Sequence, residues 1–288
     1  MGKISSLVIF ALAAALTLLV VGASLVLVPS PRKTVLVYSA PTLAGVSDEL
    51  VKLADMNVDV QVHGSVFAAN LIKAGRRPDL FLSVDVELKK SLAYRAEKTI
   101  GTYGLVFVCR QGFNGLDALV TSRIGLADPN QAPIGYRALA AMYLISEREK
   151  LGLKEELERS LNIRYIVDGS SLKIVVSNIS PSGRFYMRPN LDIVASLLEA
   201  GAVDCIFAHT PFVITRNLGK NYKVFELPEY ARFDKTPSVE IVVELATDEI
   251  KVVKLEAIAV SFSEDGDRLL RLLDRIDVGK YGFVRGVN

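Results

Sequence analysis

The sequence is poor in the residues that most catalytic centres need. Its 288 residues include only two histidines, His63 and His209, and two cysteines, Cys109 and Cys205. It has no Gly-x-Ser-x-Gly elbow, no phosphate-binding P-loop and no zinc-ligand spacing. We therefore do not expect an enzyme, and we interpret His63 as a residue at the end of a strand and not as a general base.

The sequence also lacks an excess of charge of either sign. The 34 lysines and arginines against 32 aspartates and glutamates give a formal net charge of +2. A nucleic-acid-binding surface usually needs a strongly basic patch, so we expect no nucleic-acid partner. A chain of this length can bury one large core or two modest ones.

Residues 7–28 contain no charge and are almost wholly apolar. As a helix they would be about 33 Å long, enough to cross a hydrocarbon core of roughly 30 Å. This predicts a membrane anchor within residues 1–29, with the rest of the chain on the extracellular face of the membrane. A signal segment cut after Ala23 or Ser24 is the alternative, and it would leave the protein secreted or periplasmic.

The two cysteines leave a further choice open. Outside the cell Cys109 and Cys205 could form a disulfide if the fold brings them together. They could equally remain free and buried. Neither lies near the N-terminal segment, which excludes a lipid-modified N-terminus.

Strand and helix patterns alternate after residue 33, which favours an α/β fold with mostly parallel sheets. Strands are predicted at residues 34–38, 58–62, 78–83, 104–110, 123–127, 203–207 and 254–262. Helices are predicted at residues 43–54, 65–74, 134–151, 191–200 and 265–276. Residues 238–245 and 250–253 predict a β-hairpin.

Four of the predicted helices begin where a small anion could bind. Thr42 and Ser65 each follow a strand and open a helix, and two later helices begin near Pro133 and after Asn190. A helix N-terminus has unpaired N–H groups and partial positive charge, and a hydroxyl adds a neutral donor. Each residue alone is an ordinary N-cap. Together they predict an anion site between two facing α/β lobes.

A series of short motifs runs in order along nearly all of the chain after the N-terminal segment. They are Ser39–Leu43, His63–Val66, Arg77–Asp85, Asp128–Asn130, Gly135–Arg137, Leu197–Gly201 and Lys280–Phe283. In order and spacing they resemble the molybdate/tungstate-binding proteins of ABC importers, particularly their archaeal branch.

This resemblance implies a two-lobed venus-flytrap fold of the periplasmic-binding-protein type II, with two crossovers between the lobes. Lobe one would comprise residues 33–108 plus 257–288, and lobe two residues 109–256. The implied function is to bind molybdate or tungstate outside the cell and deliver it to an ABC permease. We expect a monomer with no cofactor other than the bound anion.

The family holds its oxyanion by hydroxyls and backbone N–H groups only. By resemblance, Thr42 and Ser65 supply hydroxyls, and His209 stands where many members carry a ligand-contacting tyrosine. The complete ligand set implied is Pro41, Thr42, Gly64, Ser65, Ile134, Gly135, Leu191, Asp192 and His209.

The sequence departs from the archaeal pattern at two positions. Archaeal members usually add two carboxylates to the metal, and this chain has Ala132 and Ala208 there. A site without carboxylates favours a fully deprotonated dianion over phosphate, which carries a proton near neutral pH and benefits from a buried acceptor. Asp192 lies beside a proposed donor, where the ordinary role of a carboxylate is to stabilise a helix first turn.

Two expectations remain conditional. If His209 contacts a dianion, its protonated form is favoured and binding should tighten as the pH falls toward roughly 6.5. If it pairs only with backbone, no such effect is expected. Sulfate in place of molybdate or tungstate, and a membrane-tethered sensor of the same fold, are the alternatives to the importer hypothesis.

Overall fold

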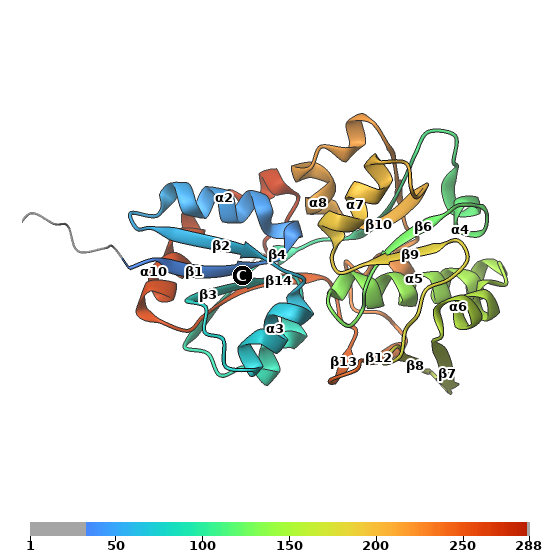
Figure 1. The fold of residues 1–288 in the computed structure, drawn as a ribbon, viewed down its shortest axis with the longest axis horizontal. Helices are drawn as coiled ribbons and strands as arrows, with labels where there is room; N and C mark the ends of the chain where they lie inside the picture. Colours follow the sequence, from blue (N-terminus) through green and yellow to red (C-terminus); the bar gives the residue numbers. More distant parts are fainter. Residues whose placement is uncertain (1–32, 287–288) are drawn as a thin grey trace, which may run out of the picture. The chain divides into compact units, whose positions relative to one another are not determined.

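The computed structural model describes residues 33–286 (Figure 1). The predicted membrane anchor, residues 1–29, lies outside the described residues. Between residues 33 and 286 no helix is both long enough and apolar enough to cross a membrane. The described chain is α/β, as predicted, and its strands form three sheets.

The first sheet has the strand order β2-β1-β3-β14-β4. Its strands are β1 (Val35–Ser39), β2 (Val58–Val62), β3 (Leu80–Ser83), β4 (Ala96–Thr102) and β14 (Glu256–Ser261). Strand β1 pairs in parallel with β2 and β3, whereas β14 runs antiparallel to β3 and β4. Helices α2 (Ala44–Leu53) and α10 (Glu264–Leu272) contact each other beside this sheet, and α3 (Ser65–Lys73) lies on its other side (Figure 1).

The second sheet has the order β11-β5-β10-β6-β9. Its strands are β5 (Leu105–Cys109), β6 (Ile124–Ala127), β9 (Phe185–Arg188), β10 (Cys205–His209) and β11 (Lys223–Glu226). The helices of this region are α4 (Ala118–Thr121), α5 (Pro133–Glu149), α6 (Leu153–Leu161), α7 (Leu191–Glu199), α8 (Thr210–Thr215) and α9 (Glu229–Arg232). Helix α5 is buried along most of its length and supplies much of the core.

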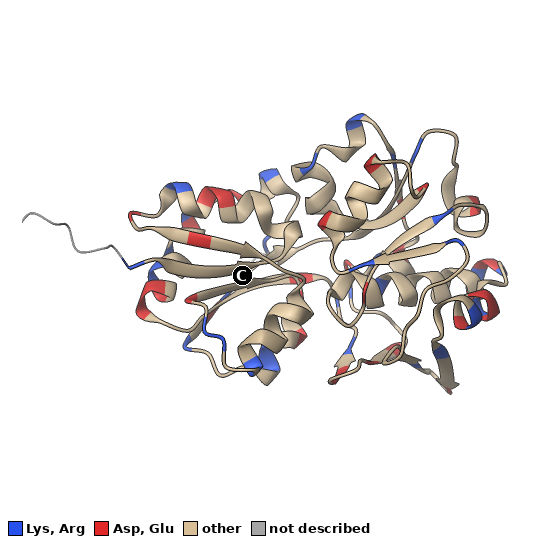
Figure 2. Cartoon of the chain, viewed as in Figure 1, with Lys and Arg blue, Asp and Glu red and all other residues tan. Residues whose placement is uncertain are grey.

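The third sheet has the order β13-β12-β8-β7. Its strands are β7 (Arg164–Asp168), β8 (Ser171–Val175), β12 (Glu240–Glu244) and β13 (Glu249–Lys251). Strands β12 and β13 pair as the predicted hairpin. Charged residues of both signs are interspersed over all three sheets and their helices (Figure 2).

The expectation of mostly parallel sheets is wrong, because six of the eleven strand pairs among the described residues are antiparallel. The chain leaves the first sheet after Thr102 and re-enters it at Glu256, and the returning strand β14 runs against its neighbours. Strand β10 also begins two residues later than predicted. These features depend on which strands meet, and a local pattern does not specify that.

The cysteines lie on adjacent antiparallel strands. Cys109 of β5 is directly opposite Cys205 of β10, and the two form a disulfide. Of the two alternatives that the sequence leaves open, the structure has the bridged one. Because β10 ends at His209, the disulfide also ties the strand that carries this histidine to β5.

Candidate anion-binding site

A small cavity lies where several helices begin, and the space in it that is open to a water molecule is about 10 Å³. The residues that line it are Ala40, Pro41, Thr42, Gly64, Ser65, Val84, Ala132, Pro133, Ile134, Asn190, Leu191 and His209. Of the nine residues predicted to bind the ligand, only Gly135 and Asp192 are not in this lining. The lining contains no aspartate, glutamate, lysine or arginine from the described part of the chain.

Four elements direct their first turns to the cavity. They are the 3-10 turn η1 (Pro41–Leu43) and helices α3, α5 and α7. The first N–H groups of a helix have no partner within the helix, and they carry its partial positive charge. In α7 the Asn190 side chain accepts a hydrogen bond from Ile193 N, as expected of an N-cap, and this leaves the amides of Leu191 and Asp192 outside the helical ladder.

Gly64 allows the loop before α5 to approach α3 closely. A Cβ atom at Gly64 would come within 2.3 Å of the Gln131 carbonyl oxygen. The same oxygen accepts a hydrogen bond from Phe67 N at 3.0 Å. The first turn of α3 and the start of α5 are therefore held in contact across the cavity.

Thr42 and His209 come from distant parts of the sequence and meet in the cavity wall. The Thr42 hydroxyl and His209 Nδ1 are 2.8 Å apart and form a hydrogen bond. Both side chains are buried. The other ring nitrogen of His209, Nε2, is buried and has no partner among the described residues. If Nε2 carries the imidazole proton, it can donate to a ligand while the Thr42 hydroxyl donates to Nδ1; if Nδ1 carries it, Nδ1 donates to Thr42, whose own hydroxyl proton is then available.

The surroundings of His209 disfavour protonation of its imidazole. Burial lowers the pKa of its imidazole well below the usual 6.5, and the positive charge of Arg137 lowers the pKa further. The physical reason for the first effect is that complete burial removes the water that would solvate the cation. The expectation that binding tightens as the pH falls concerns the protein with a dianion bound, and it stays a prediction.

Ser65 retains a hydroxyl proton for a ligand. Its Oγ accepts a hydrogen bond from Val84 N at 3.2 Å, and the side chain is buried. A serine hydroxyl can accept and donate at once. Since Val84 occupies the acceptor side, the proton can be donated into the cavity that Ser65 lines.

The nearby carboxylates are all engaged elsewhere. Asp192 forms an ion pair with Arg216 and does not line the cavity. Ala132 lines the cavity, whereas Ala208 is buried within β10. Between residues 33 and 286 no cluster of His, Cys, Asp or Glu is arranged to hold a metal ion.

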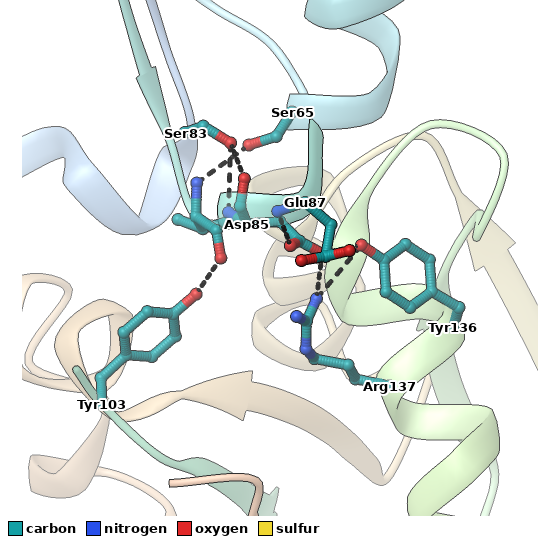
Figure 3. Close-up of polar contacts among 8 residues, drawn as sticks. Ser65, Ser83, Asp85, Glu87, Tyr103, Tyr136 and Arg137 are labelled. Atoms are coloured by element: carbon teal, nitrogen blue, oxygen red, sulfur yellow. Dashed lines mark hydrogen bonds and ion pairs between the residues drawn. The ribbon is translucent and has the colours of Figure 1, made fainter. Parts of the chain in front are cut away.

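Sequence reasoning missed a buried group beside the cavity. The Asp85 carboxylate accepts hydrogen bonds from Arg137 and from the Tyr136 hydroxyl (Figure 3). Both partners lie in a motif that carries the family resemblance, but only the fold brings them to Asp85. A charged residue inside the otherwise apolar pattern of α5 was the one available signal.

Comparisons with known proteins agree with this architecture. The model of a family described as bacterial extracellular solute-binding protein matches residues 35–247. The chain is similar to the periplasmic molybdate-binding protein of Azotobacter vinelandii, with 14% identity, a TM-score of 0.62, and 88% of this chain and 100% of that chain covered.

The chain is also similar to the regulatory domain of HypT from Salmonella typhimurium. The apo form has 12% identity and a TM-score of 0.53 over 88% of this chain and 99% of that chain. The bromide-bound form has 12% identity and a TM-score of 0.51 over 88% and 98%. At such identities the likeness is one of fold. A search of curated proteins gives no match.

Proposed function

Because this chain belongs to the bacterial extracellular solute-binding protein family, we propose that it binds a tetrahedral oxyanion outside the cell and delivers it to an ABC permease. The family and fold are those of solute-binding proteins and not of enzymes. The ligand that we propose is molybdate or tungstate.

One observation carries the choice of ligand class, namely that the cavity offers hydrogen-bond donors and no carboxylate. The Ser65 hydroxyl, the hydrogen-bonded Thr42–His209 pair, which has one proton left to donate, and the first turns of α3, α5 and α7 all reach it. Fully deprotonated oxyanions accept hydrogen bonds and donate none, so they match such a lining. Protonated phosphate would leave its own O–H without an acceptor.

The magnitude of binding is compatible with uptake at low concentration. A hydrogen bond to a charged group contributes roughly 1.5–3 kcal/mol. Several such bonds offset the desolvation of the anion and leave an affinity on the order of micromolar to nanomolar.

The similar folds support two versions of this function. Molybdate is the ligand named for the Azotobacter vinelandii protein, which supports an importer component. The HypT domain is named as regulatory, and one of its structures holds bromide, which supports an anion sensor as the second candidate. Both versions require the same anion site.

Calorimetric titration of the full-length protein tests the proposal. We expect a Kd of micromolar or below for molybdate and tungstate, weaker binding of sulfate, and weaker binding still of phosphate. If none of these anions binds, or if phosphate binds best, the proposed ligand class is wrong. Copurification of a permease from the native membrane would separate the importer from the sensor.

A further inference from the structure

A fully buried ion pair lies directly behind the candidate site. Arg137 Nη1 is 2.7 Å from Asp85 Oδ2, and neither side chain is exposed to solvent. The Tyr136 hydroxyl donates to the same carboxylate oxygen, and Glu87 N donates to the other one at 2.9 Å (Figure 3). Both oxygens of Asp85 are therefore engaged.

The pair connects the two walls of the cavity. Asp85 follows β3 of the first sheet, whereas Arg137 lies in the second turn of α5, which packs against strands of the second sheet. Val84, one residue before Asp85, donates to the Ser65 hydroxyl. Ile134, one turn before Arg137, lines the opposite wall. A short chain of contacts thus runs from Ser65 through the ion pair to the start of α5.

A buried ion pair is weak evidence for a role in overall stability. Taking two charges out of water is costly, and an apolar pair of similar size is often at least as stabilising. Arg137 also keeps its Nε and Nη2 atoms buried without a partner in the described part of the chain. These unpaired donors place positive potential beside the cavity, where the charge already acts on His209.

We propose that Asp85 and Arg137 are positioning residues for the bound anion. The pair holds the cavity wall that contains Ser65 against the opposite wall, which is formed by the start of α5. Hydroxyl and amide donors from both walls can then reach the same anion. This inference rests on the proposed anion-binding function of the cavity. The pair does not line the cavity and so does not touch the anion. Its loss should therefore weaken the binding of every anion by the same factor.

The decisive variants are Asp85→Asn, which removes one charge, and Tyr136→Phe, which removes one hydroxyl and keeps the ring. The matched control is Asp204→Asn. Asp204 also pairs with an arginine, Arg123, at 2.7 Å, but the pair lies on the second sheet away from the cavity. Melting temperatures and the Kd for molybdate and for sulfate are measured for each full-length variant at a temperature where it is folded.

We expect Asp85→Asn to weaken the binding of both anions at least tenfold, by the same factor. Tyr136→Phe should weaken it two- to fivefold, and this milder variant keeps the test valid if Asp85→Asn does not fold. Asp204→Asn should lower the melting temperature and change Kd less than twofold. Wild-type Kd values in Tyr136→Phe and in folded Asp85→Asn would overturn the inference, as would equal weakening in the Asp204→Asn control.

Hydrogen exchange on the ligand-free proteins separates this inference from the proposed function. Asp85→Asn should speed amide exchange at residues 65–68 and 134–137 relative to the control. If the wild type binds no oxyanion but this exchange rises, the ion pair still joins the walls and the proposed ligand is wrong. If the wild type binds molybdate but neither exchange nor Kd changes, the positioning role is wrong.

Discussion

Replacing Ser65 by alanine separates a ligand-binding role of its hydroxyl from a purely structural one. The side chain is buried, its Oγ accepts a hydrogen bond from Val84 N at 3.2 Å, and it lines the cavity. Ser65→Ala removes the hydroxyl and keeps the Cβ atom at the first position of α3. It therefore removes one donor to the ligand and one acceptor for the backbone.

Each loss has its own magnitude. A hydrogen bond to a charged ligand contributes roughly 1.5–3 kcal/mol, so Kd should rise by about 10- to 150-fold. The buried Val84 N–H loses its acceptor, which costs about 1–3 kcal/mol of folding stability. For a domain of this size that corresponds to a fall in melting temperature of about 2–4 °C per kcal/mol.

The two effects are measured by calorimetric titration with molybdate and by thermal unfolding without ligand. Ser47→Ala is the control, because Ser47 is also buried and donates to Ala44 O at 2.9 Å, but it does not line the cavity. The control should lose stability and keep its Kd. Normal anion binding by Ser65→Ala would show that the site lies elsewhere.

Four further changes test the same structure. Thr42→Val should weaken anion binding about tenfold or more and leave His209 Nδ1 unpaired, and an unchanged Kd in calorimetry would remove the Thr42 hydroxyl from the site. Gly64→Ala should also weaken binding, because its Cβ would lie 2.3 Å from a backbone oxygen of the facing loop, and wild-type affinity would contradict that contact. Replacing both Cys109 and Cys205 by alanine should lower the free energy of unfolding by about 3–5 kcal/mol, since the bridge closes a long loop with a sequence separation of 96; urea unfolding with no loss would contradict this. Stability should fall as the pH drops below 6.5, because the unfolded state then binds a proton that buried His209 does not, with a slope of at most about 1.4 kcal/mol per pH unit. Urea unfolding at pH 5, 6 and 7 should show a smaller slope in His209→Gln, and equal slopes would mean that His209 titrates normally in the folded protein.

Much of the local structure was readable from the sequence, although five of the fourteen strands in the described residues were not predicted, namely β4, β7, β8, β9 and β11. Residues 58–62 form β2 as predicted, because alternation of valine with polar residues is a property of the segment itself. The starts of α3 and α7 were also predicted. For α7 the reason is local, because the Asn190 side chain caps the first turn, whereas Ser65 lies at the first position of α3 and makes no capping bond. Strand β4 was missed because its first half is polar and partly exposed, with Glu97 and Lys98 side by side, a pattern that resembles a loop.

What the sequence could not determine is which of these local pieces meet. Thr42 and His209 are 167 residues apart, and Asp85 and Arg137 are 52 apart, yet each pair is in hydrogen-bond contact. The antiparallel return of β14 likewise depends on pairing between distant segments. The sequence determined where helices begin and which residues could donate hydrogen bonds, because turn chemistry and capping are local. Only the tertiary structure decided that the Thr42 hydroxyl meets His209 in the cavity wall and that a buried ion pair joins the walls, because burial and contact are set by residues far apart in the chain.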